Sequence, residues 1–263
     1  MIDSGAGSTL NIMTARLPTQ RLDGVLLTHF HSDHIAELYE LNLNSWVQGR
    51  EHPLAVYWPE GVKQVVEGVN QTYELDVSYR VAHHGSDLLP PELGVLESHP
   101  VTIGVVVSTG DLKISAFKAD HSPVHPAVGY RIDYKDRSVL VTGDTVITDD
   151  VIRNADQADL ILTDALSLII IDVLAETADR FGMNRNAKVL RDVRDYHAST
   201  TSLIKMAEST GSMVGFYHMV PPQANIVMEK IYERDLPDNV LLTNDGMWFT
   251  LPVGGDDIDV TQS

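Results

Sequence analysis

Short apolar runs alternate with amphipathic stretches along the whole chain. Short apolar runs, one of them a β-branched run at residues 101–108, predict strands at residues 25–27, 54–57, 101–108, 138–142, 158–164 and 213–217. Residues 113–119 alternate between apolar and polar side chains, which predicts a half-exposed strand. Apolar residues at helical spacing predict helices at residues 62–69, 166–181, 187–196 and 200–210. This succession of strands and helices indicates an α/β protein.

The helix predicted at residues 166–181 differs from the others because it is apolar nearly all round, above all at residues 168–171. Such a helix buries more than one face, so we expect it to pack against a partner subunit in a homodimer. Residues 239–252 predict a closing hairpin around Asn244-Asp245-Gly246. The sequence therefore predicts one domain over residues 1–253, followed by an acidic, flexible tail over residues 254–263.

Composition narrows the class of protein. The chain has 263 residues, 43% of them apolar, with 19 basic and 37 acidic side chains and a formal net charge of −18. Nucleic-acid binding draws most of its affinity from Lys and Arg on phosphates, and no dense cluster of these is visible, so we do not expect nucleic acid among its partners. No apolar run reaches the length of a membrane span, and the first residues form no export leader, so we expect a soluble protein without a membrane partner. With no cysteine, its location stays unknown: the cytoplasm, or the periplasm if an N-terminal signal is missing.

Three imidazoles and a carboxylate fall within six residues, at His29, His31, Asp33 and His34. His29 and His31 point to one side of an extended segment, whereas Asp33 and His34 open a predicted helix, so a turn can direct the two pairs to neighbouring ions. Imidazole with carboxylate suits zinc, with iron and manganese as competitors. The alternatives are a histidine-rich loop in solvent or a helix cap at Ser32 or Asp33, but a cap needs one of these residues and not four.

A further carboxylate ends a predicted buried strand. Asp144 follows residues 138–142 and lies next to Gly143, which allows close approach of the backbone. This position suits a ligand between two cations. The alternative is a turn aspartate that caps a helix beginning near Thr148.

A weaker candidate site lies at Arg80, His83 and His84, next to Gly85. These side chains are candidates for the mouth of a substrate pocket, because loops on a rigid scaffold often carry binding residues. The alternative is an ordinary polar loop.

The segment His29-x-His31-x-Asp33-His34 resembles the H-x-H-x-D-H signature of the metallo-β-lactamase superfamily, and the resemblance spans about residues 2–252. It implies two zinc ions per chain, with Mn²⁺ or Fe²⁺ as alternatives. One ion is then held by His29, His31 and His121, the second by Asp33, His34 and His218, and Asp144 spans both. His125, four residues after His121, is the competitor for the third histidine ligand.

The context of His197 resembles the additional active-site histidine of the ribonuclease Z branch, which includes transfer-RNA 3′-end endonucleases and arylsulfatase-like hydrolases. The resemblance makes Asp33 and His197 the catalytic candidates and Asp164 the acidic partner of His197. It also implies that Asp3, in a glycine-rich turn, orients the ligands without binding metal. The alternatives are a buried helix-capping histidine at His197 and a simple capped turn at Asp3.

The family fold is a four-layer αββα sandwich, in which two β-sheets pack together with helices outside. Family members usually carry several strands before the Asp3 segment, so either the sequence is truncated or its start is assigned late, and one sheet lacks its first N-terminal strands. The resemblance implies a hydrolase that uses a metal-bridging hydroxide on a small ester, an aryl sulfate or a phosphodiester, since the charge of −18 disfavours RNA. The alternatives are a transfer-RNA 3′-processing endonuclease, a β-lactamase or lactonase, and a non-catalytic, metal-stabilised interaction protein.

Overall fold

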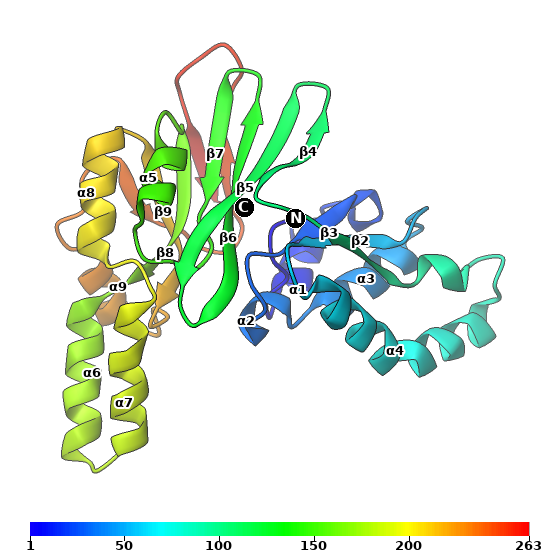
Figure 1. The fold of residues 1–263 in the computed structure, drawn as a ribbon, viewed down its shortest axis with the longest axis horizontal. Helices are drawn as coiled ribbons and strands as arrows, with labels where there is room; N and C mark the ends of the chain where they lie inside the picture. Colours follow the sequence, from blue (N-terminus) through cyan, green and yellow to red (C-terminus); the bar gives the residue numbers. More distant parts are fainter. Residues whose placement is uncertain (263) are drawn as a thin grey trace. The chain divides into compact units, whose positions relative to one another are not determined.

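The computed structural model describes residues 1–262 and divides them into two compact units, unit 1 over residues 1–102 and unit 2 over residues 103–262. The patterning predicted one domain over residues 1–253 and did not mark this boundary. Each unit has a β-sheet of its own (Figure 1). Within residues 1–262 no helix is both long and apolar enough to cross a membrane.

Unit 1 is built on three parallel strands in the order β1-β2-β3. They are β1 (Gly24–Leu26), β2 (Leu54–Trp58) and β3 (Leu96–Pro100). The connecting helices are α1 (Ser8–Thr14), α2 (Ser32–Ile35), α3 (Leu38–Val47) and α4 (Val62–His84), with 3-10 turns at Thr19–Arg21 and Pro91–Leu93. Central side chains such as Val25 and Leu54 are fully buried, as in parallel strands that are covered on both faces.

Helix α4 extends far beyond the predicted residues 62–69. Gly61 and Gly85, with φ of 96° and 86°, flank it, so glycines in the left-handed region mark both of its ends. The last turns of this helix therefore carry Arg80, His83 and His84. The sequence had suggested a loop at these positions. The Arg80 side chain donates a hydrogen bond to Asp76 in the same helix, at 2.8 Å.

Unit 2 contains a seven-stranded sheet in the order β10-β9-β8-β7-β6-β5-β4. Its strands are β4 (Gly104–Thr109), β5 (Leu112–His121), β6 (Val124–Tyr134), β7 (Arg137–Val141), β8 (Leu160–Leu166), β9 (Met213–Val220) and β10 (Val240–Leu242). Strands β4 to β7 are antiparallel to their neighbours, whereas β7 to β10 are parallel. Because β5 and β7 both run antiparallel to β6, strands β5, β7, β8 and β9 all end at the same edge of the sheet.

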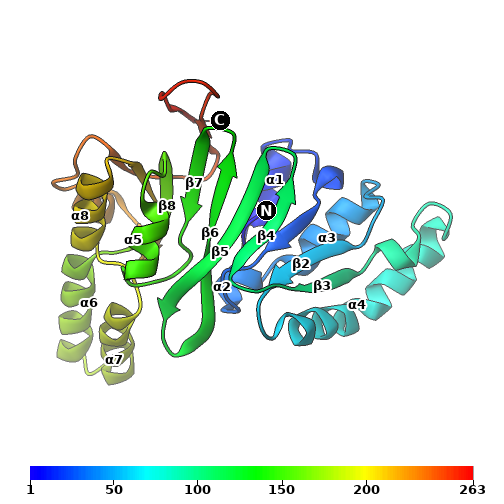
Figure 2. The ribbon, with the colours of Figure 1, turned by 45° about the horizontal axis from the view of Figure 1, so that its top comes forward.

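Helices and sheet share one hydrophobic core in unit 2. The helices are α5 (Asp149–Ala155), α6 (Leu168–Arg180), α7 (Asn184–Asp192), α8 (Thr200–Thr210) and α9 (Ile226–Tyr232), with a 3-10 turn at Val193–Asp195. Leu140, Ile161 and Val214 are direct neighbours across β7, β8 and β9, and they pack with side chains of α5 and α8. Figure 2 shows α5 beside β8. This packing fixes the strand ends that carry the functional side chains.

Helix α6 is amphipathic and not apolar all round. It buries Ile170 and Ala178 against the core, whereas Ile169 and Val173 remain 52% and 58% exposed.

The C-terminal segment departs from its prediction. The turn at residues 244–246 exists, but β10 joins β9 in parallel and β11 (Met247–Thr250) pairs with β12 (Asp259–Gln262), so the predicted hairpin is wrong. Residues 259–262, predicted as part of a flexible tail, thus form a strand. Arg137 anchors the preceding loop by donating to the carbonyl oxygens of Gly255 and Asp257.

Candidate metal centre

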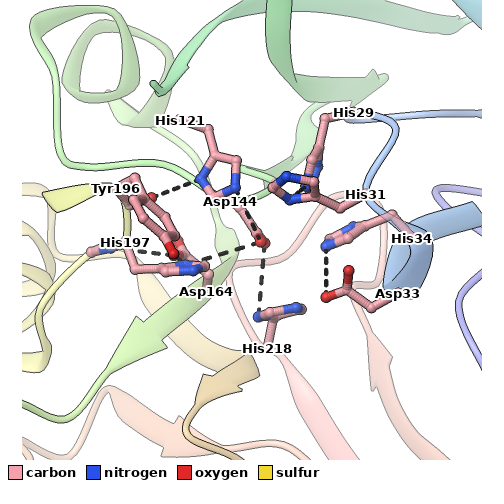
Figure 3. Close-up of polar contacts among 12 residues, drawn as sticks. His29, His31, Asp33, His34, His121, Asp144, Asp164, Tyr196, His197 and His218 are labelled. Atoms are coloured by element: carbon pink, nitrogen blue, oxygen red, sulfur yellow. Dashed lines mark hydrogen bonds and ion pairs between the residues drawn. The ribbon is translucent and has the colours of Figure 1, made fainter. Parts of the chain in front are cut away.

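The histidine motif of unit 1 directly follows β1. Its side chains project from the loop after Leu26 and from the short helix α2. His29 Nε2 lies 2.9 Å from His31 Nδ1, and His34 Nε2 lies 3.7 Å from Asp33 Oδ2 (Figure 3). One loop therefore groups three imidazoles and a carboxylate.

Asp3 lies against this loop. Its carboxylate accepts hydrogen bonds from the backbone N–H of Thr28 at 2.7 Å and from the Thr28 hydroxyl at 2.8 Å. Asp3 Oδ2 also lies 2.8 Å from His34 Nδ1. A carboxylate on one ring nitrogen fixes the orientation of the ring and leaves the other nitrogen as the ligand atom. The same segment approaches the loop closely, since a Cβ at Gly5 would lie 2.2 Å from the Asp33 carbonyl oxygen.

The second group of side chains lies at the common strand edge of unit 2. His121 is the last residue of β5, Asp144 follows β7, and Asp164 and His218 are register neighbours in β8 and β9. His197 comes from the segment between the 3-10 turn at Val193–Asp195 and α8. Parallel strands present their carboxyl ends together, which is why residues distant in sequence meet here.

Asp144 lies at the centre of this second group. Its Oδ2 is 4.0 Å from His121 Nε2 and 3.9 Å from His197 Nδ1, and its Oδ1 is 3.7 Å from His218 Nδ1 (Figure 3). The Asp144 side chain is buried, as are those of His121 and His197. A buried carboxylate among three imidazoles needs positive charge near it, from protonated rings or from a metal ion.

Asp164 holds His197 from behind. Asp164 Oδ2 accepts from the backbone N–H of Ala198 at 3.2 Å and lies 2.8 Å from His197 Nδ1. With Nδ1–H donating to this carboxylate, Nε2 becomes the ring nitrogen that addresses a substrate. Burial, followed by the neighbouring Asp144 carboxylate, raises the pKa of Asp164 above its ordinary value.

Two contacts, one in each unit, were not predicted from the sequence. The Thr28 side chain connects Asp3 with the histidine loop, and the carbonyl oxygen of Tyr196 lies 2.8 Å from His121 Nδ1. The Tyr196 contact directs His121 Nε2 toward Asp144. A backbone carbonyl carries no residue-type signal, so only the fold could reveal this contact.

The donor atoms fit a divalent metal ion. In unit 2 the donor atoms of His121, Asp144 and His197 all lie within 4.8 Å of one another. In unit 1 the facing nitrogens of His29 and His31 are of the type that zinc, manganese and iron accept. Each unit thus offers imidazole and carboxylate ligands that can hold a metal ion.

His125 does not belong to the group around Asp144. Its side chain is exposed and lines a separate cavity of about 260 Å³, together with Lys118, Asp120 and Asp150. The geometry therefore favours His121 over His125 as the third histidine donor.

Comparison with known proteins gives the class of the chain. A family model described as β-lactamase superfamily domain matches residues 2–212, and the chain belongs to this superfamily. It has the metallo-β-lactamase fold and is a metal-dependent hydrolase that acts on ester bonds. This excludes the non-catalytic alternative.

Individual relatives point to one branch. The chain is 30% identical over 227 residues to ribonuclease Z of Mycobacterium sp. (strain KMS), covering 85% of this chain and 75% of the relative. Its fold resembles that of human tRNase Z, short form, with a TM-score of 0.63 and 17% identity over 96% of this chain and 88% of that one. It also resembles the metallo-β-lactamase fold protein YhfI of Bacillus subtilis, with a TM-score of 0.63 and 16% identity over 93% and 83% of the two chains. The resemblance to the ribonuclease Z branch is confirmed.

These relatives overturn the expected partners. The expectation of a small-molecule ester in place of nucleic acid is wrong, because the relatives are named as ribonucleases. The error came from the net charge of −18, which is a sum over the whole chain. Binding of a polyanion depends on charges at the contact surface, and a local group of cations can act against the overall sign.

Proposed function

We propose that this protein is a ribonuclease Z-like endonuclease that hydrolyses a phosphodiester bond at the 3′ side of transfer-RNA precursors. The observation that carries the proposal is the His197–Asp164 pair beside Asp144, in a chain 30% identical to a ribonuclease Z. A histidine held by a buried carboxylate is suited to donate a proton to a leaving oxygen. The substrate class comes from the relatives, which are ribonucleases Z.

We propose that the seven ligands of the family pattern hold two zinc ions. By the family pattern, His29, His31 and His121 would hold the first, Asp33, His34 and His218 would hold the second, and Asp144 would serve both. When bound, two such ions make a nucleophile available from water at neutral pH and neutralise charge on the phosphate. Manganese and iron(II) are the competing metals for this donor set.

The side chains then act in defined roles. Asp3 and the Tyr196 carbonyl fix the rings of His34 and His121, so that each presents Nε2. The exposed Asp33 carboxylate would accept the proton released by the attacking water. As the bond from phosphorus to the 3′ oxygen breaks, His197 donates a proton to that oxygen, and Asp164 stabilises the charged ring before it transfers. The products are a 3′-hydroxyl and a 5′-phosphate.

The test is cleavage of a transfer-RNA precursor with a 3′ extension, run beside bis(p-nitrophenyl) phosphate, a small diester that requires only the metal centre. We expect a single cut near the end of the acceptor stem and hydrolysis of both substrates, each abolished by chelator and restored by zinc. Zinc-dependent hydrolysis of the small diester with no cleavage of the precursor RNA would disprove the assignment to RNA.

A further inference from the structure

Helices α6 and α7 form a hairpin whose connecting loop lies at the end away from the sheet of unit 2 (Figure 1). Residues 180–191, which cover this loop and most of α7, contain four Arg or Lys residues and no Asp or Glu. This composition is unusual in a chain with 37 acidic and 19 basic residues. The net charge of −18 therefore conceals a local group of positive charges in this segment.

The positive charges of the hairpin beyond the tip are neutralised by carboxylates of the same hairpin. Arg191 pairs with Asp179, Arg194 lies 2.5 Å from Asp172, and Lys188 lies 2.5 Å from Asp192. One pair joins α7 to α6, one joins the following 3-10 turn to α6, and one stays within α7. They account for Lys188, Arg191 and Arg194.

The tip of the hairpin, residues 180–185, is different. Arg180 and Arg185 are exposed, and neither forms an ion pair within residues 1–262. Between them stands Phe181, whose side chain is 78% exposed. An aromatic ring costs free energy in water, so a ring held in solvent between two unpaired cations has the chemistry of a contact surface.

Two arginines around an exposed ring suit a nucleic acid better than an apolar partner. Guanidinium groups bind phosphates, and an aromatic face stacks on an unpaired base. A membrane surface would also attract the arginines, but an anionic bilayer offers no unpaired base to the exposed Phe181 ring. An RNA strand at the tip meets Asp179 next to Arg180, but this carboxylate is already paired with Arg191.

The hairpin also has a direct structural connection to the candidate centre. Helix α7 has nine residues and leads through the 3-10 turn at Val193–Asp195 to Tyr196 and His197. The tip therefore lies roughly 20 Å from His197 along this path, from the rise per residue of the two helix types. A substrate of one nucleotide cannot span that distance, whereas a structured RNA can.

We propose that the tip of the α6–α7 hairpin, through Arg180, Phe181 and Arg185, binds RNA nucleotides remote from the bond that is cleaved, with phosphates on the arginines and a base on the ring. This proposal rests on the proposed function, because it deepens the recognition of the same substrate. It assigns RNA affinity to the tip and bond cleavage to the metal centre.

The experiment compares full-length, zinc-loaded variants on two substrates. The test variants are Arg180→Glu/Arg185→Glu and Phe181→Ala. The matched control is Lys113→Glu/Lys205→Glu, which makes the same charge change at exposed positions of β5 and α8. For each protein, kcat/KM is measured on the transfer-RNA precursor and on bis(p-nitrophenyl) phosphate, and Kd for the RNA is measured by fluorescence anisotropy at several salt concentrations.

We expect the double charge reversal to lower the ratio of RNA to diester kcat/KM at least tenfold, through KM, while the control keeps the wild-type ratio. The slope of log Kd against log salt should fall by about 1.5, the value for two lost phosphate contacts. Phe181→Ala should weaken RNA binding about tenfold with the salt slope kept, since stacking carries no charge.

Each contrary result has a distinct meaning. Wild-type cleavage of the RNA with test and control variants alike would overturn the role of the tip and leave the proposed function standing. Absence of RNA binding and RNA cleavage by the wild type, with the diester still hydrolysed, would overturn both. Loss of binding to vesicles containing phosphatidylserine, with RNA binding intact in the test variants, would assign the tip to membranes and overturn the proposal.

Discussion

The two units supply their donor side chains in opposite ways. In unit 1 four donors fall within six residues, on one loop and the first turn of α2. In unit 2 the donors come from separate elements, and His121 and His218 are nearly a hundred residues apart in sequence. The loop of unit 1 is held by side-chain hydrogen bonds to Asp3, whereas the edge of unit 2 is held by strand register.

This difference determines how the donor side chains of each unit respond to substitutions around them. A loop fixed by a few hydrogen bonds depends on those individual partners. A sheet edge is fixed by many cooperative contacts, so its donors keep their places unless a donor itself is removed. Substitutions in the two units should therefore fail in different ways.

The largest effect is expected at the centre of unit 2. Replacing Asp144 with Ala removes the carboxylate that three imidazoles face, so hydrolysis should fall at least a thousandfold and the zinc content should drop. His31→Ala, in the loop of unit 1, should give a similar loss. Activity is measured on bis(p-nitrophenyl) phosphate and metal by elemental analysis. Asp111→Ala, in an exposed turn, is the control, and full activity of Asp144→Ala without metal would contradict the assignment.

The supporting carboxylates allow a matched comparison of the units. Asp3→Asn and Asp164→Asn should each cost about 10- to 100-fold in activity, the usual effect of losing a group that orients an active side chain. Asp3 contacts a proposed ligand, His34, so its variant should bind zinc more weakly. Asp164 contacts His197, so its variant should keep its zinc and lose kcat. If both variants lost zinc equally, the distinct roles would be refuted.

A glycine pair tests how closely Asp3 and its neighbours support the loop. In Gly5→Ala the new Cβ would meet the Asp33 backbone oxygen at 2.2 Å, so the loop must shift and activity should fall about tenfold. Gly68→Ala, inside α4, meets nothing within 4 Å and should stabilise unit 1 by up to about 1 kcal/mol with activity kept. Turnover and thermal unfolding of both variants give the answer. A fully active Gly5→Ala protein would show that the close approach is unimportant.

The smallest effect concerns the surface of unit 1. Hydrogen bonding from Arg80 lowers the pKa of Asp76, and the Tyr39 hydroxyl donates to the same carboxylate. A carboxyl group whose pKa is lower in the folded than in the unfolded state stabilises the fold at pH values above the unfolded-state pKa. This stabilisation is lost as pH falls through the folded-state pKa. Because Asp76 is about one-third exposed, the gain should be about 0.5 kcal/mol. The free energies of unfolding of wild type and Asp76→Asn, measured with urea, should differ by this amount at pH 7. The difference should shrink as pH falls below about 4, and a difference that grows in acid would refute the stabilising role of Asp76.

The sequence by itself determined the loop of unit 1 and the class of the protein. The spacing of His29, His31, Asp33 and His34 is local information, because six consecutive residues at a strand end cannot move far apart. Strands such as β2, β5 and β7 were also predictable, since alternation and β-branching are properties of the segment itself. The helix α4 was underestimated because its later turns are polar, and the burial of one helix face depends on what packs against it.

Only the tertiary structure showed how the second group of donors, named from the resemblance, comes together, and only it decided the organisation of the C-terminal segment. The resemblance selected His121 over His125, but only the fold shows that His121 ends β5 with a buried side chain, whereas His125 lies in β6 with an exposed one. The strand β12 and the exposed ring of Phe181 are likewise results of pairing and exposure, which depend on partners elsewhere in the chain. The residue type determines the chemistry of a donor, whereas long-range strand register and packing determine its position.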